Sequence, residues 1–365
     1  MISEENQQAT PNVGKLNGSE LILDYGSPQM EWEHLRTRVG VLELSSRGRV
    51  CLLGEDRHRF LNGQVTNNVR DLADATGCYT LITNNKGIIW GDANVYRLPE
   101  ELLLDLEPGF TKQFSDHLEK YIVADDVEIV DTSPHFGLIS IQGPLADELL
   151  GTLEPDSLDQ RPAKPYNIMQ RTSEELGDYY IANHPRIRSK GYDIFVPHDS
   201  LPELQRRLLA QVLPLGGGLC GWSSLETLRI EMGIPRFPID MTPSILAPEL
   251  GLEERMISYS KGCYIGQEVI NRIRSIGRVN RHLVGIIFDS ESGDILGTSG
   301  TIQNQQKSAG FVTSTAFSHA LGRTIGLGFV KRGHSQSGTS LEFHPNEQDK
   351  SYEVAVSDLP FYPPR

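Results

Sequence analysis

The sequence has few cysteines, and their spacing does not build a metal site or a disulfide framework. Its four cysteines, Cys51, Cys78, Cys220 and Cys263, are scattered, and no C-x-x-C pair is present. Zinc sites and self-contained iron–sulfur clusters need clustered thiolates. The ten histidines are equally dispersed. We therefore predict no resident metal, and any iron–sulfur cluster would need ligands from a partner or from residues that meet only in space.

Long apolar runs and the common catalytic motifs are also missing. No run approaches the ~20 apolar residues that span a bilayer. The first six residues, Met1–Asn6, are acidic and lack the apolar core of a secretory signal. We therefore expect a cytoplasmic protein with no membrane partner. No P-loop, no G-x-G-x-x-G after a strand, no H-E-x-x-H and no G-x-S-x-G occurs, which removes the simplest nucleotide-binding, metalloprotease and hydrolase assignments.

The chain as a whole has no excess of positive charge, but one short stretch is strongly basic. The 365 residues include 48 acidic and 34 basic ones, for a net charge of −14, which argues against general nucleic-acid coating. Between residues 261 and 282, however, five basic residues face one glutamate: Lys261, Arg272, Arg274, Arg278 and Arg281 against Glu268. This basic stretch indicates either an anionic ligand or partner, which includes RNA at a local contact, or a solvated helix face.

Strands and helices mix without the strict alternation of a parallel sheet, which predicts an α+β body. Periodicity predicts strands near 41–53, 78–83, 88–97, 102–106, 127–130, 138–141, 179–182 and 192–196. It predicts helices near 29–39, 55–62, 111–120, 144–150, 201–213, 223–232 and 267–276. Residues 279–365 are rich in β-branched residues, glycines and turns, which is typical of a small β-barrel or sandwich.

We therefore divide the chain into a polar N-terminal arm (residues 1–28), an α+β body (29–276) and a C-terminal β domain (277–365). In the arm, one short strand is possible at Leu21–Leu23. Residues 157–166 are expected to form a surface connection. The triplet Gly216–Gly218 is expected to be a flexible linker, with a glycine-rich ligand loop as the lesser alternative.

The stretch Lys261–Glu268, K-G-C-Y-I-G-Q-E, is the best candidate for a chemical role. Its two glycines suit a tight loop, and the helix predicted from Gln267 would place Cys263 just before a helix N-terminus. Positive potential there, together with Lys261, would favour a thiolate. The alternative is a buried structural cysteine.

Three polar residues lie inside predicted regular structure. Asp193 interrupts an apolar strand, and Arg229 and Glu231 lie on the helix before Gly233. Carboxylates in such places can accept the paired N–H groups of a heterocycle, and an arginine can bind a carboxylate tail. The alternative is a surface salt bridge and a strand residue that faces water.

Several of these residues belong to stretches that resemble the sequence signature of a known family. K-G-C-Y-I-G-Q-E, continuing as Arg272-x-x-Ser275-x-Gly277-x-Val279-x-Arg281, resembles the signature of the YgfZ-type folate-binding proteins. These proteins belong to the superfamily of the glycine cleavage aminomethyltransferase, or T-protein. Further similarity lies in the stretches 38–45, 60–64, 141–144, 191–193, 229–235, 310–314 and 325–330.

The resemblance implies a ring of three domains around a tetrahydrofolate pocket, with two interleaved α+β domains and a C-terminal antiparallel β-barrel. It implies that Asp193 and Glu231 face the folate pterin and that Arg229 lies in the same motif; Lys261 and Tyr264 are further candidate folate contacts. It also implies a role in maintaining iron–sulfur enzymes, including those that modify tRNA, with Cys263 as a redox thiol or transient ligand.

One departure from the superfamily concerns catalysis. The aminomethyltransferases carry Gly-Gly-x-x-Asp-Asp where this chain has Gly87-Ile88-Ile89-Trp90-Gly91-Asp92, so Asp92 alone remains of the aspartate pair. One-carbon transfer to folate needs a carboxylate near the reacting nitrogens. We therefore favour a folate-binding accessory protein for iron–sulfur cluster assembly or repair. The alternatives are a tetrahydrofolate-dependent aminomethyltransferase or demethylase that uses Asp92, and a folate-fold protein without folate that docks a protein or RNA.

Overall fold

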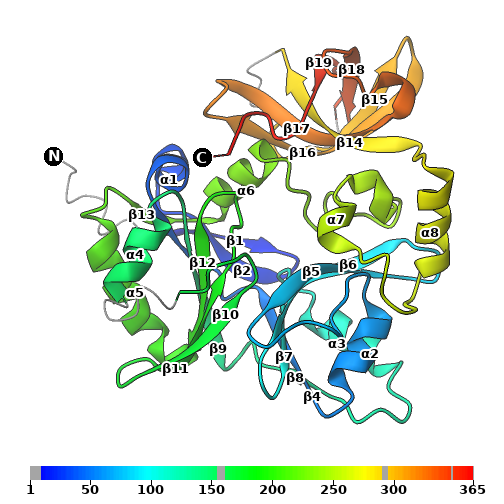
Figure 1. Ribbon diagram of the computed structural model, residues 1–365. Helices are drawn as coiled ribbons and strands as arrows, with labels where there is room; N and C mark the ends of the chain where they lie inside the picture. The colour runs from blue at the N-terminus through cyan, green and yellow to red at the C-terminus, as the bar shows by residue number, and fades with distance from the viewer. Residues whose placement is uncertain (1–9, 154–160, 290–294, 347, 365) are drawn as a thin grey trace. The chain divides into compact units, whose positions relative to one another are not determined.

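The computed structural model describes residues 10–153, 161–289, 295–346 and 348–364, which form two compact units. The first unit comprises residues up to Thr80 together with Asp92–Leu225, and the second comprises Leu81–Gly91 and Glu226–Pro364. Helices and sheets mix in the first unit and a barrel dominates the second, so the predicted α+β class with a C-terminal barrel is confirmed (Figure 1). No helix in the described part is long and apolar enough to cross a membrane.

A six-stranded sheet with the strand order β10-β11-β12-β9-β3-β13 forms one layer of the first unit. Its strands are β3 (Gly40–Glu43), β9 (Phe136–Gln142), β10 (Ile168–Ser173), β11 (Gly177–Asn183), β12 (Gly191–Pro197) and β13 (Gly218–Cys220). Helices α4 (Ala146–Leu153) and α5 (Leu201–Val212) cover one face of this sheet (Figure 1). Their leucines pack on the valines and isoleucines of the strands, because each helix presents one apolar stripe.

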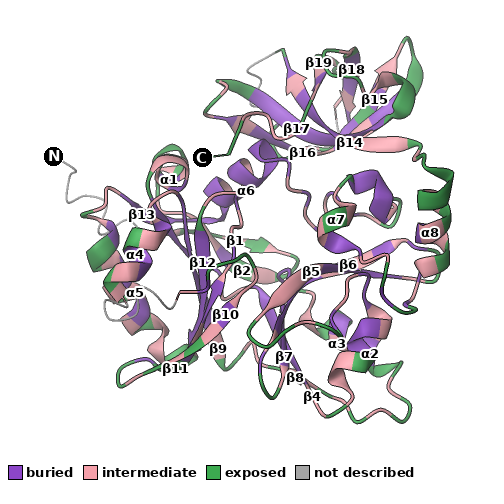
Figure 2. Ribbon diagram, in the orientation of Figure 1, coloured by how far each residue is buried: buried purple, intermediate pink, exposed green. Residues whose placement is uncertain are grey.

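A five-stranded antiparallel sheet has the strand order β5-β6-β7-β4-β8. Its strands are β4 (Gly48–Leu53), β5 (Gly77–Thr83), β6 (Ile89–Arg97), β7 (Leu102–Leu106) and β8 (Glu128–Asp131), and its helices are α2 (Arg57–Gln64) and α3 (Thr111–Glu119). β5 and β6 are neighbours in the sheet and form a hairpin, whose turn contains Gly87 at φ +70°. Figure 2 shows that the buried residues concentrate in the strands of these sheets.

The N-terminal stretch contains more regular structure than expected. β1 (Asn12–Leu16) pairs with β2 (Ser19–Asp24) as an antiparallel hairpin, and Leu21 is buried. The possible strand at Leu21–Leu23 is therefore real and has a partner, and helix α1 (Pro28–Thr37) follows it. Polar composition hid this hairpin, because only one face of it is covered.

The second unit contains helices α6 (Trp222–Glu231, its first four residues counted with the first unit), α7 (Glu253–Met256) and α8 (Gln267–Ile276) and a closed six-stranded barrel. The barrel order is β14-β17-β16-β15-β18-β19, with β14 (Arg281–Phe288), β15 (Gly300–Asn304), β16 (Lys307–Ser318), β17 (Arg323–Lys331), β18 (Ser340–Pro345) and β19 (Tyr352–Ser357). Alternate residues of these strands fill its interior, among them Phe288 and Phe343. Of the two folds predicted for residues 279–365, a β-barrel and a β-sandwich, the structure shows the barrel.

Two local predictions need correction, and a third can be compared with the structure only in part. The glycine triplet is not a flexible linker: Gly216, with a positive φ of 71°, lies in the turn after α5, and Gly218 begins β13. Helix α6 begins at Trp222, one residue before the predicted start at 223. The expected connection at 157–166 lies partly outside the described residues, which resume at residue 161.

Candidate functional site

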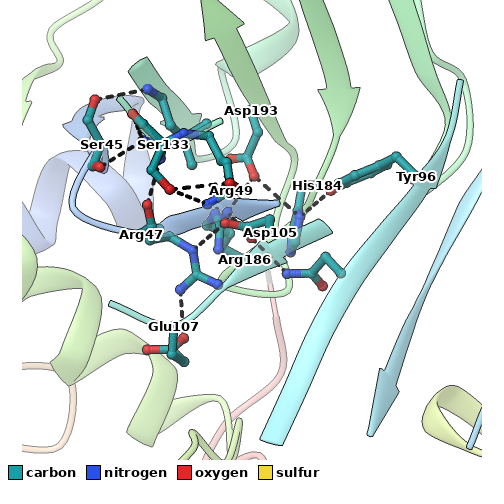
Figure 3. A network of polar contacts seen from close by, with 12 residues as sticks. Ser45, Arg47, Arg49, Tyr96, Asp105, Glu107, Ser133, His184, Arg186 and Asp193 are labelled. Carbon is teal, nitrogen blue, oxygen red and sulfur yellow. Dashed lines mark hydrogen bonds and ion pairs between the residues drawn. The ribbon is translucent and has the colours of Figure 1, made fainter. Parts of the chain in front are cut away.

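A buried network of charged side chains joins the two sheets of the first unit (Figure 3). Asp105 comes from β7, Asp193 from β12, and Arg186 from the turn between β11 and β12. Arg186 Nη2 lies 2.9 Å from Asp105 Oδ2 and 2.6 Å from Asp193 Oδ2, and its Nε donates to Asp193 Oδ1 at 3.0 Å. One guanidinium therefore holds a carboxylate from each sheet.

Arg47 extends the network from the turn before β4. Its Nε lies 2.7 Å from Asp105 Oδ1 and its Nη1 lies 2.6 Å from Glu107 Oε1. Burial by itself would raise the pKa of Asp105, but the Arg47 and Arg186 guanidiniums outweigh it and hold that pKa well below its usual range. Asp105 is therefore a permanently ionised centre of the network.

Asp193 differs from Asp105 in whether burial or the neighbouring positive charge has the larger effect on its pKa. It is completely buried, and among the described residues its ion-pair partners are the Arg186 guanidinium and, at 3.3 Å, the His184 ring. Burial outweighs the attraction of Arg186, so the pKa of Asp193 is raised. The reading of Asp193 as a strand residue that faces water is therefore wrong.

The network resembles a metal site in geometry but not in charge. Ligand atoms of Asp105, His184 and Asp193 lie within 4.8 Å of one another, and all three residues are buried. Arg186 already bridges both carboxylates, and the His184 Nδ1 lies 2.7 Å from the Tyr96 hydroxyl. A cation at the centre would have to displace the Arg186 guanidinium, so we assign an ion-pair network here.

Asp92 lies on β6 and continues the polar face of the same sheet. The Tyr79 hydroxyl donates a hydrogen bond to Asp92 Oδ2 at 2.6 Å. Burial, followed by the nearby Glu107 charge, raises the pKa of Asp92 to about 7, although the Tyr79 hydrogen bond opposes this shift. A half-buried carboxyl with this pKa can take up or release a proton at neutral pH.

In the second unit, Arg229 and Glu231 lie at the end of α6 and are both buried. Arg229 pairs with Asp240 and with Glu226 (2.5 Å), and it donates to Ser314 Oγ at 2.7 Å. The Glu231 carboxylate accepts hydrogen bonds from Ser318 and Tyr362, both at 2.5 Å. These contacts tie α6 to the barrel and to the C-terminal segment, so neither side chain forms a surface salt bridge.

The K-G-C-Y-I-G-Q-E loop, residues 261–268, contains both buried and exposed side chains. Cys263 is exposed, whereas Lys261 and Tyr264 on either side are buried. The Lys261 ammonium lies 5.1 Å from the centre of the Tyr264 ring. Helix α8 begins at Gln267, as predicted, so the loop holds the thiol outward shortly before a helix N-terminus. The alternative of a buried structural cysteine is wrong for Cys263.

The loop is fixed by the tip of the β5–β6 hairpin within the second unit. Thr83 Oγ1 donates to the carbonyl of Ile265 at 2.6 Å. Gly266 has φ +89°, and a Cβ there would lie 2.5 Å from Thr83 Oγ1 and 2.7 Å from the Asn84 carbonyl oxygen. Only glycine fits this turn without displacement of the hairpin. The accessible thiol is therefore carried by a constrained loop.

Tyr264 contributes an unusual polar group. Its hydroxyl is buried and has no hydrogen-bond partner in the described part of the chain. Burial raises the pKa of Tyr264 to about 12, so the hydroxyl stays protonated. A buried hydroxyl without a partner costs about 1–3 kcal/mol, which a bound polar group would offset.

The seven candidate residues thus separate between the two units. Asp92 and Asp193 belong to the first unit; Arg229, Glu231, Lys261, Cys263 and Tyr264 belong to the second. Sequence reasoning missed Arg47, Asp105, Glu107 and Arg186. The same signal that singled out Asp193, a carboxylate inside an apolar strand, was present for Asp105 in Leu102–Leu106.

Comparisons with known proteins agree with this fold. The family described as GCVT N-terminal domain matches residues 6–261, and the family described as glycine cleavage T-protein C-terminal barrel domain matches residues 281–363. An aminomethyltransferase from Bacillus pumilus is 25% identical over 346 residues, which cover 94% of this chain and 93% of that protein. One from Streptomyces avermitilis is 28% identical over 350 residues, covering 94% and 92%. The crystal structure of glycine cleavage system aminomethyltransferase T from Bartonella henselae has the same fold, with a TM-score of 0.83, 19% identity, and coverage of 99% of this chain and 97% of that one.

Proposed function

Because this chain belongs to the glycine cleavage T-protein family, we propose that it is a folate-binding accessory protein that supports the assembly or repair of iron–sulfur clusters. Its clients would include iron–sulfur enzymes that modify tRNA. The observation that carries the proposal is the exposed Cys263 on a loop that Gly266 and the β5–β6 hairpin hold in place. The YgfZ-type resemblance of that loop supports the same assignment.

The ligand in this proposal is tetrahydrofolate, which the aminomethyltransferases of the family use. The structure fits a heterocyclic ligand at one point: the buried Tyr264 hydroxyl lacks a partner in the described part of the chain, and a pterin offers both N–H and C=O groups. Tyr264 and Lys261 would hold the ligand. Arg229 and Glu231, which are buried in the same unit, would support the site through their contacts with Asp240 and Ser318. Asp193, in the first unit, stays a predicted folate contact.

The role of the thiol can be tested by complementation. A strain that lacks its own YgfZ-type protein would receive the wild type, Cys263→Ala, or Cys78→Ala as a matched control with a less exposed cysteine. We expect Cys78→Ala to restore iron–sulfur enzyme activity and Cys263→Ala to fail at equal protein levels. Equal rescue by both variants would remove the thiol from the mechanism.

A second candidate function is tetrahydrofolate-dependent aminomethyl transfer or demethylation, with Asp92 as the acid–base group. The names of the relatives and the near-neutral pKa of Asp92 favour it, while Gly91 in place of a second aspartate weighs against it. Purified protein would be incubated with tetrahydrofolate and an aminomethyl or N-methyl donor. Methylene-folate formed by the wild type but not by Asp92→Asn would establish this activity; no product from either would exclude it.

Direct titration with tetrahydrofolate separates both candidates from a protein that only docks a partner. We expect binding that weakens in Tyr264→Phe and in Glu231→Gln. If no binding occurs, the exposed Arg272, Arg274 and Arg278 become the main interaction feature, and an anionic protein or RNA becomes the better assignment.

A further inference from the structure

The pairing of β6 with β7 brings a second carboxylate to Asp92. In this antiparallel pair Asn94 lies opposite Asp105, and the Asn94 amide donates to Asp105 Oδ2 at 2.9 Å. Side chains two residues apart on a strand share a face of the sheet. Asp92 precedes Asn94 by two residues on β6, and Glu107 follows Asp105 by two residues, just past the end of β7 at Leu106. The Glu107 charge acts on Asp92 from there.

Glu107 presents one bonded and one unbonded oxygen. Arg47 Nη1 lies 2.6 Å from Oε1. Oε2 is buried and has no hydrogen-bond partner within the described ranges, and the whole residue is only 7% exposed. A buried carboxylate oxygen without a donor is costly. A hydrogen-bond donor other than Arg47 would therefore stabilise Glu107 Oε2.

Asp92 can supply that donor. Its Oδ2 accepts the hydrogen bond from the Tyr79 hydroxyl at 2.6 Å, so a proton on this carboxyl belongs on Oδ1. Two carboxylates that lie close together in poorly hydrated surroundings cannot both ionise without a large electrostatic penalty. A proton held between them removes the repulsion and satisfies Glu107 Oε2 at once.

We propose that Asp92 and Glu107 act as an acid–base pair that holds one proton between them, with Glu107 supplying from the neighbouring strand the second carboxylate that Gly91 does not provide. Its use in one-carbon transfer rests on the second candidate function above. When the pair gives its proton to a basic nitrogen of a ligand, the Asp92 O–H bond breaks. The pair then passes from one negative charge to two, and the nitrogen gains one positive charge.

The charged and titratable groups that face Asp92 are Tyr79 from β5, Arg47 from the turn before β4, and Asp105 and Glu107 from β7 and its end. Burial is the largest influence and raises the pKa of Asp92, and Glu107 is the next. Tyr79 and Arg47 lower it, and Asp105 raises it slightly. Removal of the Glu107 charge should therefore lower the pKa of Asp92 even though burial is unchanged.

The pair can be measured in the free protein by NMR titration of side-chain carboxyl carbons, with both resonances assigned in the wild type by through-bond correlation to the main chain. In the wild type we expect the Asp92 resonance to shift with a midpoint near neutral pH and the Glu107 resonance to respond at that midpoint, because the two carboxyls share the proton. In Glu107→Gln the Asp92 midpoint should fall by about one pH unit or more. The matched control Glu100→Gln, an exposed glutamate on the same hairpin, should leave it unchanged.

Two results would overturn the pair. One is an Asp92 midpoint that is the same in Glu107→Gln and in the wild type, which would assign the shift to burial alone. The other is a Glu107 resonance that shows no inflection at the Asp92 midpoint; this measurement needs only the wild-type protein once assigned, so it decides the matter even if Glu107→Gln folds poorly. Neither result depends on folate, so failure of the pair and failure of folate binding are separate outcomes.

Discussion

Replacement of Arg186 by methionine should be strongly destabilising. Methionine keeps an unbranched side chain of similar length but removes the guanidinium that binds Asp105 and Asp193. The Arg186 side chain is 9% exposed and both carboxylates are fully buried. Removing one partner from a buried ion pair leaves an uncompensated charge, which costs about 3–5 kcal/mol. We expect a loss of this size in the free energy of unfolding at pH 8, measured by urea denaturation followed by circular dichroism.

The loss should shrink as the pH falls. Asp193 already has a raised pKa because of burial, and without Arg186 its pKa rises further. A carboxyl whose pKa is raised in the folded state contributes stability that is present at low pH and is lost as the pH rises through the folded pKa. Asp105 does not contribute to this difference: its lowered pKa changes stability only below the unfolded pKa of an aspartate, about 3.9, and therefore not between pH 5 and pH 8. The deficit of Arg186→Met should therefore be smaller at pH 5 than at pH 8.

Two further variants make the test specific. Arg186→Met combined with Asp193→Asn removes one uncompensated carboxylate and should regain part of the lost stability at pH 8. Arg206→Met is the control, because Arg206 pairs with Glu203 at 2.7 Å but is 69% exposed; its effect should be far smaller. A loss in Arg186→Met no larger than that of the control, or a loss that does not change with pH, would refute the assignment of a buried ion-pair network.

The remaining predictions concern the loop at residues 261–268. In the native protein, brief alkylation followed by mass spectrometry should label Cys263 first and Cys220 last, because the former is exposed and the latter buried; fast labelling of Cys220 would contradict the structure. Gly277→Ala should cost about 1–2 kcal/mol for its positive φ alone, since no atom lies closer than 3.9 Å to the added Cβ. Gly266→Ala should lower the urea midpoint further, because its Cβ would also meet Thr83 and Asn84; equal effects would mean that the hairpin does not hold the loop.

Helices and strands whose bounds depend on the residues within them were predictable from the sequence. The strand Leu102–Leu106 has the predicted bounds, and α8 ends at Gly277 with φ +69°, as its glycine indicated. Each of these depends on periodicity or on one turn residue. The K-G-C-Y-I-G-Q-E motif also indicated correctly that a helix follows its cysteine.

Features that depend on distant pairing were not predictable in this way. Strand β13 is three residues long and pairs in parallel with Gly40–Leu42 of β3, nearly 180 residues earlier. A Cβ on Gly217 would lie 2.0 Å from the Val39 carbonyl oxygen, so the glycine triplet serves close backbone approach. Read locally, three glycines indicate flexibility. Their true role depends on a strand that only the fold brings beside them.

Arg186 was missed for a related reason. It lies in a turn with other basic residues, and such a turn reads as solvated. It is buried because Asp193 and Asp105, from two different sheets, lie on either side of it. A single buried carboxylate in an apolar strand implies a buried partner somewhere in the chain. That reasoning identifies the need for an arginine but does not select which one.

Charge balance in the network explains why Asp92, rather than another carboxyl, carries the proton. Arg49 is buried as well, and its guanidinium donates to the main-chain carbonyls of Ser45, Arg47 and Ser133, with no carboxylate in direct contact within the described part of the chain. Counting His184 as neutral, the buried groups apart from Asp92 are three guanidiniums and three carboxylates: Arg47, Arg49 and Arg186 with Asp105, Glu107 and Asp193. The six charges already cancel. An ionised Asp92 would add a negative charge to a balanced and poorly hydrated cluster, which favours the protonated form and is the physical reason that the pKa of Asp92 is raised to about 7.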